Sequence, residues 1–173
     1  MNDYGVPNDY GSIMHYPADP HDDAKCSDTL NCKNGGYIDP NDCNGCKCPL
    51  GLGGQLCKVA ARPCDRNLIA TNTIRTISSS GASQCHYFVK APAGKQIYFR
   101  FRSMSGFPDA GYHRCGFAYV TVNFNSDFNK SGVHVCADSG PPNLLSSVSE
   151  SDQMIGIYRG IVSSQFTMDY SIY

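Results

Sequence analysis

Ten cysteines in 173 residues constrain this chain more than any other feature, and they fall into two blocks. Six lie within residues 26–57 and four within residues 64–173, so each block holds an even number. Cysteines at this density point to disulfide bonds and an oxidising compartment. The spacing of the first block allows several pairings and does not choose among them. The first block is therefore predicted to be a small module whose bridges, rather than an apolar core, supply its stability.

The second block has the sequence pattern of an all-β domain. Apolar and polar side chains alternate in several short runs, which Gly, Pro, Asn and Ser separate. Such period-two runs predict half-buried antiparallel strands, and no run has the length and period of an amphipathic helix. A β-sandwich is the fold that this pattern favours. The predicted strands are residues 97–102, 119–124, 132–136, 154–158 and 165–173.

Charge and hydropathy exclude several classes of function. The formal net charge is −1, which argues against non-specific binding to nucleic acids or anionic membranes. No stretch has the apolar length needed to span a bilayer. The segment Met1–Gly5 has neither the charged region nor the apolar core of a signal peptide. A secreted cysteine pattern without a secretion signal suggests a truncated chain or an incomplete gene model.

Three segments resemble, in order, parts of one protein family. Asp9–Tyr16, which reads Asp-Tyr-Gly-Ser-Ile-Met-His-Tyr, is similar to the Met-turn of astacin-type zinc metalloendopeptidases, a metzincin family. Residues 26–57 look like an EGF-like module: Asn34–Tyr37 fits its first half, and Cys46-Lys47-Cys48-Pro49 fits its second. The four cysteines and strand pattern of residues 64–173 resemble a CUB domain. This order resembles that of nematode-type astacins.

The resemblance implies both the fold and the bridges. It predicts a mostly β chain, in which an EGF-like module (residues 26–57) is followed by a CUB-type antiparallel β-sandwich (residues 64–173). Residues 1–25 would be a loosely ordered remnant of the catalytic domain, residues 58–63 a short linker, and no complete catalytic domain would be present. The disulfides that the family pattern implies are Cys26–Cys43, Cys32–Cys46, Cys48–Cys57, Cys64–Cys85 and Cys115–Cys136.

The resemblance also implies a zinc protease chemistry of which this chain carries one part. Met14 would form the apolar floor beneath the zinc, and Tyr16 would be the labile fifth ligand that stabilises the oxyanion. The zinc helix H-E-x-x-H is absent from the printed sequence, and no two of the five histidines stand at helical ligand spacing. Because a zinc site needs several protein ligands, we expect the chain alone to bind no zinc and to hydrolyse no peptide.

Other sites follow from shorter patterns. Calcium is not expected, because Ala24-Lys25 and Ala118 stand where calcium-binding EGF-like modules and CUB domains carry acidic residues, and calcium needs several oxygen ligands. Cys43 and Cys46 have a spacing seen in zinc sites, but the surrounding turns favour disulfides. Asn129-Lys130-Ser131 is an N-glycosylation sequon in a polar loop, so Asn129 is a candidate for a glycan in a secreted chain.

The leading hypothesis is that this is the C-terminal part of an astacin-type zinc metalloendopeptidase. Its EGF-like and CUB modules would recognise extracellular proteins or protease substrates. The alternative is a non-catalytic extracellular binding protein whose two modules are its whole function. An in-frame zinc helix upstream of the printed sequence would support the first hypothesis. A signal peptide placed directly before Asn2 would support the second.

Overall fold

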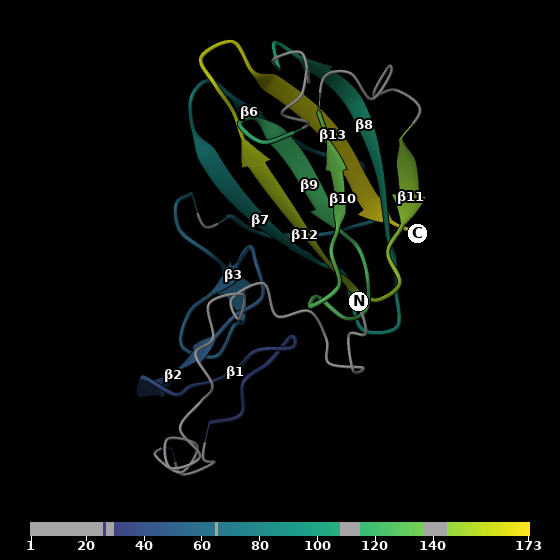
Figure 1. Cartoon of the computed structure of the whole chain (residues 1–173). Helices are drawn as coiled ribbons and strands as arrows, with labels where there is room; N and C mark the ends of the chain where they lie inside the picture. Colours follow the sequence, from purple (N-terminus) through teal and green to yellow (C-terminus); the bar gives the residue numbers. More distant parts are fainter. Residues whose placement is uncertain (1–25, 27–29, 65, 108–114, 137–144) are drawn as a thin grey trace, which may run out of the picture.

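The computed structural model describes residues 26, 30–64, 66–107, 115–136 and 145–173. Within these ranges every regular element is a strand and none is a helix, which confirms the prediction of a mostly β chain. The strands form a sandwich with a small module at one end (Figure 1). Met14 and Tyr16, the two residues of the predicted Met-turn, lie outside the described residues.

The small module is built from two short hairpins. β1 (Tyr37–Asp39) pairs antiparallel with β2 (Asp42–Lys47), and β3 (Leu52–Gly53) pairs antiparallel with β4 (Val59–Ala60). β4 lies inside residues 58–63, which were predicted to be a linker. This segment therefore takes part in a hairpin, because part of it pairs with β3 before the chain continues into the sandwich.

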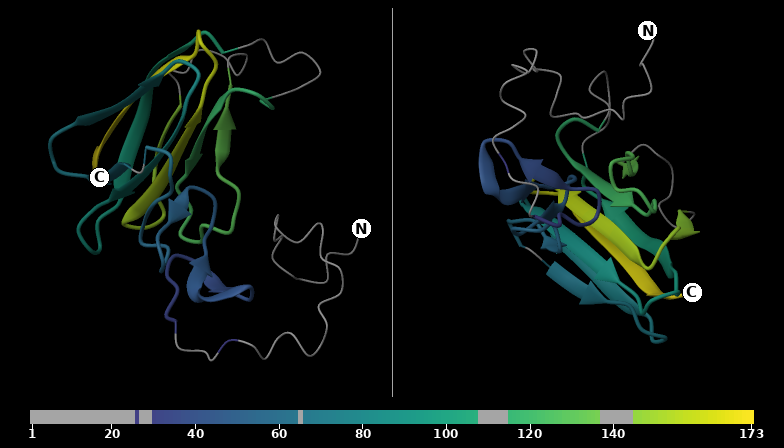
Figure 2. Two further views of the ribbon diagram at one scale, coloured as in Figure 1. Left: turned by 90° about the vertical axis from the view of Figure 1, so that its left-hand side faces the viewer. Right: turned by 90° about the horizontal axis from the view of Figure 1, so that it is seen from below.

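Two sheets make up the sandwich, and Figure 2 shows them as two layers. The strand order is β10-β9-β12-β7-β5 in one sheet and β11-β8-β13-β6 in the other. Neighbouring strands are antiparallel except for β5, which runs parallel to β7. The strands are β5 (Arg66–Ile69), β6 (Arg75–Ser80), β7 (Gln84–Lys90), β8 (Ile97–Ser105), β9 (Tyr119–Asn123), β10 (Val133–Val135), β11 (Ser146–Val148), β12 (Gln153–Arg159) and β13 (Gln165–Ile172).

The five predicted strands correspond to β8, β9, β10, β12 and β13. Residues 154–158 were predicted to be half-buried, but the structure buries five consecutive residues of β12. β7 was not predicted, and it too has five consecutive buried residues. A strand that is covered on both faces shows no alternation of apolar and polar side chains. Both strands lie inside the five-stranded sheet, where the small module covers their outer face.

Aromatic side chains dominate the core between the sheets. The rings of Tyr158 and Phe166 are stacked with their centroids 5.4 Å apart. The Tyr158 hydroxyl lies within hydrogen-bonding distance of the carbonyl oxygens of Gly81 (2.8 Å) and Ser164 (2.9 Å). Burial raises the pKa of this phenol, so it remains a neutral donor that ties β12 to the two loops.

Candidate functional site

Each of the ten cysteines is described, and each is bonded to another. Three bridges lie in the small module and two in the sandwich, and none joins the two. They are the five pairs that the family resemblance implies: Cys26–Cys43, Cys32–Cys46, Cys48–Cys57, Cys64–Cys85 and Cys115–Cys136.

The small module packs on the outer face of the five-stranded sheet through a shared apolar cluster. On the module side, Leu52 of β3 is 5% exposed, although the module is too small to bury a leucine alone. On the sandwich side, outward-facing residues of β7 and β12 cover it. Burial of one such side chain contributes about 1.5–3 kcal/mol, so this cluster provides the core that the module lacks. Its members are Leu52, Cys57, Ala60, Phe88, Phe128, Ile155 and Ile157.

Polar contacts surround this apolar junction. Asn129 Nδ2 donates a hydrogen bond to the carbonyl oxygen of Gly35 at 3.2 Å. Lys90 Nζ donates to the carbonyl oxygen of Lys58 at 3.3 Å and lies 4.6 Å from the centroid of the Phe88 ring. Sandwich side chains therefore bind the backbone of both the module and the connecting segment. Hydrogen bonds to backbone groups set an orientation that apolar packing alone does not specify.

The backbone of Gly51 closely approaches β12 in the junction. It has φ +91°, a conformation that side chains other than glycine rarely adopt. A Cβ atom built at this position would lie 2.5 Å from Ile155 Cγ2. The same residue accepts a hydrogen bond through its carbonyl oxygen from Ala61 N at 2.9 Å. Glycine is therefore required here both for the turn and for contact with β12.

The described histidines do not form a zinc site. His86 Nδ1 donates to the carbonyl oxygen of Ala61, and its Nε2 pairs with the Gln84 amide, both at 3.0 Å. His134 Nδ1 is bonded to the Thr121 hydroxyl at 3.0 Å. These histidines stand on β7 and β10, with two strands between them. Among the described residues no group of three or more His, Cys, Asp or Glu could hold a metal, so these residues do not fit the zinc of the resembled family.

Ala118, the position of the expected calcium ligand, is 2% exposed and belongs to the core between the sheets. Its methyl group cannot coordinate a cation. The absence of calcium from this chain therefore stays a prediction.

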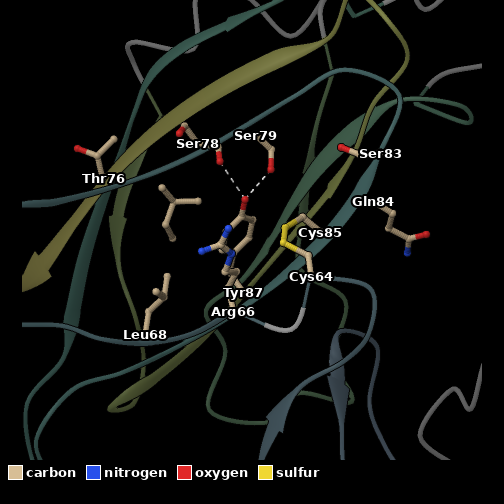
Figure 3. Close-up of a pocket in the computed structure, with 11 residues that line it drawn as sticks. Cys64, Arg66, Leu68, Thr76, Ser78, Ser79, Ser83, Gln84, Cys85 and Tyr87 are labelled. Atoms are coloured by element: carbon tan, nitrogen blue, oxygen red, sulfur yellow. Dashed lines mark hydrogen bonds between the residues drawn. A yellow bond between two sulfur atoms is a disulfide. The ribbon is translucent and has the colours of Figure 1, made fainter.

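A cavity of about 400 Å³ opens between β5, β6 and β7 at one edge of the sandwich (Figure 3). Its floor is apolar and includes Leu68, Ile77 and the Cys64–Cys85 disulfide. Its remaining lining is polar and uncharged except for one guanidinium group. The polar members are Arg66, Thr76, Ser78, Ser79, Ser83, Gln84 and Tyr87.

Tyr87 stands at the centre of this cavity, as Figure 3 shows. Its hydroxyl is hydrogen bonded to Ser79 Oγ and lies 3.1 Å from the carbonyl oxygen of Ser78. Burial raises the pKa of the Tyr87 phenol, while the Ser79 bond and the charge of Arg66 act in the opposite direction. The hydroxyl is therefore neutral at physiological pH and joins β7 to the edge strand of the opposite sheet.

Sequence reasoning did not find the junction or the cavity. For the junction a signal was present, because the run Cys85–Val89 is apolar or aromatic at nearly every position. Such a run indicates a strand covered on both faces, and therefore a second body packed on the sheet. For the cavity there was no signal, because its residues converge only after β5, β6 and β7 have taken their places in two different sheets.

Relatives in Caenorhabditis elegans match nearly the whole sequence. The chain is 37% identical to the zinc metalloproteinase nas-34 over 98% of its own length. It is 30% identical to the zinc metalloproteinase nas-26 over 89% of its length. It spans 34% and 46% of these two relatives, respectively. No family model matches the chain.

Among solved structures, the chain is similar to the CUB1-EGF-CUB2 domain of human MASP-1/3. The TM-score is 0.51 and the sequence identity 16%, and the match covers 75% of this chain and 50% of that one. At this identity the likeness concerns the fold alone. It assigns the sandwich to the CUB fold and the small module to the EGF-like fold, as the sequence predicted.

The part of the chain that the structure describes contains no helix long and apolar enough to cross a membrane. These homologues are all zinc metalloproteinases of nematodes. The order of modules, the disulfides and these homologues agree. The homologues that cover this chain are nematode astacin-type zinc metalloproteinases, and the chain itself carries an EGF-like module followed by a CUB domain.

Proposed function

We propose that this chain is the C-terminal recognition part of an astacin-type zinc metalloproteinase that acts outside the cell. Residues 26–57 form the EGF-like module and residues 64–173 the CUB domain, and together they bind extracellular protein substrates. The observation that carries the proposal is the apolar junction, in which Leu52 and Ala60 pack against Phe88, Ile155 and Ile157. Two modules with a common core present their surfaces in one fixed arrangement.

A fixed arrangement matters for recognition because binding then orders fewer degrees of freedom. A partner that contacts both modules does not have to bring them together, so less of its interaction energy is lost as conformational entropy. Lys90 and Asn129 add polar contacts that specify the orientation. The unit is therefore suited to position a substrate relative to a catalytic domain.

Proteolysis by this chain alone is not part of the proposal. The printed sequence has no H-E-x-x-H motif. His86 is hydrogen bonded to the carbonyl oxygen of Ala61, and His134 to the Thr121 hydroxyl. Tyr16 and Met14 would assist a zinc site that other residues must build. The purified chain should therefore show no chelator-sensitive peptide hydrolysis, and a Tyr16→Phe change should not alter background cleavage. Hydrolysis that a chelator and Tyr16→Phe both abolish would overturn this part.

A chimera tests the recognition role. In nas-34 the region that aligns with this chain is either removed or replaced by this chain, and kcat/KM is measured on extracellular proteins and on a short peptide. We expect the chimera to exceed the deleted enzyme on protein substrates and to equal it on the short peptide. A chimera with Leu52→Asp, which places a charge in the junction, should lose most of the gain. Equal rates for chimera and deleted enzyme on every protein substrate would contradict the proposal.

A further inference from the structure

The two sheets of the sandwich differ by one strand, and the difference falls at one edge. The five-stranded sheet ends with β5, and the four-stranded sheet ends with β6. No described strand pairs with the outer edge of β6, so none of the described strands lies opposite β5. The cavity of about 400 Å³ occupies this position.

The pattern of lining residues shows that the cavity has the place of a strand. β5 contributes Arg66 and Leu68, which are two positions apart and so lie on one face of their strand. β6 instead contributes the consecutive residues 76–79. Consecutive residues point to opposite faces of a strand, so it is the backbone edge of β6 that borders the cavity. The empty space therefore lies over the inner face of β5 and beside β6, as an added strand would.

The edge of β6 has hydrogen-bonding capacity on the cavity side. The carbonyl oxygen of Ser78 accepts a bond from the Tyr87 hydroxyl at 3.1 Å, which places this carbonyl toward the cavity. A carbonyl oxygen has a second lone pair. The N–H of the same residue points to the same side of a strand. An extended peptide could therefore bond to both groups, as in strand addition to other sheet edges.

The side chains of the cavity define what such a peptide would carry. Arg66 is exposed, and none of the lining residues is a carboxylate. An acidic side chain would thus meet a cation, and no described lining residue would oppose it with a negative charge. Leu68 lies about 6.6 Å further along β5, since two residues of a strand span that length. An apolar side chain two positions from the acidic one would cover Leu68 and Ile77.

We propose that the edge of β6 is a binding site for an extended peptide segment of a partner protein, with an acidic residue facing Arg66 and an apolar residue two positions away facing Leu68. The inference rests on the proposed recognition role and specifies the surface that performs it. The main chain of the peptide bonds to β6, which supplies affinity. The paired acidic and apolar side chains supply selectivity.

The test uses the full chain and a fluorescein-labelled peptide that is rich in threonine and has the sequence Glu-Thr-Leu at its centre. Binding is followed by fluorescence anisotropy. We expect Arg66→Glu to weaken binding by about tenfold or more. A peptide with Lys in place of Glu should show the reverse preference and bind better to Arg66→Glu. Methylation of alternate backbone nitrogens of the peptide should abolish binding, because it removes the main-chain donors.

A matched pair of variants tests the contribution of the β6 backbone. Ser78→Pro removes the N–H on the cavity side, and proline is tolerated at edge strands, whereas Ser78→Ala keeps this N–H. We expect binding to be lost in the first and retained in the second, with both unfolding cooperatively on heating. Hydrogen exchange gives a readout that does not depend on these variants: the Ser78 amide should exchange rapidly in the free chain and slowly with peptide bound.

Several outcomes would overturn the proposal. One is equal binding of the methylated and unmethylated peptides, and another is the absence of a charge-swap preference at Arg66. A third is slow exchange of the Ser78 amide in the free chain, which would mean that another strand already pairs with β6. Sedimentation would then show whether that strand comes from a second copy or from the same chain. If the nas-34 chimera recognises protein substrates while the peptide does not bind, the β6 site is wrong and the recognition role stands. If the peptide binds while the chimera gains nothing, the recognition role is wrong.

Discussion

Asn129 of the CUB domain donates a hydrogen bond from Nδ2 to the carbonyl oxygen of Gly35 in the EGF-like module, at 3.2 Å. The same nitrogen is the attachment point of the predicted glycan. A Cβ atom built on Gly35 would lie 2.6 Å from it, so the module backbone already occupies the space beside this nitrogen. A glycan on Asn129 and the observed docking of the Gly35 turn therefore compete for the space beside this nitrogen.

The glycan should loosen the junction. Ser131→Ala removes the sequon and keeps the Asn129 amide, whereas Ser131→Thr keeps the sequon. We expect the glycosylated Ser131→Thr chain to be cut faster by protease within residues 58–63 than the Ser131→Ala chain. Limited proteolysis with mass spectrometry, which also reports the glycan, measures both quantities. Equal cleavage of glycosylated and unglycosylated chains would show that the junction tolerates the sugar.

Gly51→Ala should separate the module from the CUB domain. Gly94→Ala is the matched control, because Gly94 also has positive φ but has open space where a Cβ would stand. The control should lose about 1–2 kcal/mol of unfolding free energy from backbone strain alone. Gly51→Ala should lose more, because its methyl group collides with Ile155. Urea unfolding of both variants, with proteolysis of residues 58–63, measures the difference, and equal losses would contradict the role of this contact.

Glu150 should make stability depend on pH in the acid range. Its Oε2 accepts hydrogen bonds from Ser126 N at 2.9 Å and Ser126 Oγ at 3.0 Å. The backbone bond first, and the hydroxyl bond second, hold the pKa of this carboxyl below its usual value of 4.5. A pKa lowered by folding adds stability at pH values above 4.5, and this stability is lost as the pH falls through the lowered pKa.

Glu150→Gln removes the charge and should remove this pH dependence. The melting temperature of the wild-type chain should exceed that of the variant at neutral pH. The difference should shrink below pH 4.5 and vanish once the carboxyl is protonated in the folded chain. Thermal unfolding at a series of pH values measures this difference. A difference that persists unchanged in strong acid would mean that the charge of Glu150 does not support the loop.

The disulfides should be confined to their own modules. Three bridges are expected within residues 26–57 and two within residues 64–173, in the pairing that the structure contains. Proteolytic mapping without reduction tests this directly. A peptide that links the two modules through a cystine would contradict both the pairing and the module boundaries.

The sequence by itself determined the fold class and much of the CUB domain. β8 and β13 could be predicted because each has one face in the core, so apolar and polar side chains alternate along it. β9 could be predicted because Val120 and Val122 alternate with the polar Thr121 and Asn123, although the structure buries all four side chains. The two blocks of cysteines likewise separated the chain into two modules, since residues close in sequence form the bridges of each. These are local signals, and local signals can be read from a linear sequence.

Only the tertiary structure decided how the modules are joined and where the β6 edge opens. β7 gave no alternation because Phe88 faces the EGF-like module while Tyr87 faces the core between the sheets. Residues 58–63 resembled a linker because β4 is a strand only through its pairing with β3. The composition of residues 58–63 does not reveal that contact. The cavity exists because β5 and β6 end different sheets, which is a property of long-range pairing. Such pairing depends on residues far apart in the chain, so no single segment of sequence encodes it.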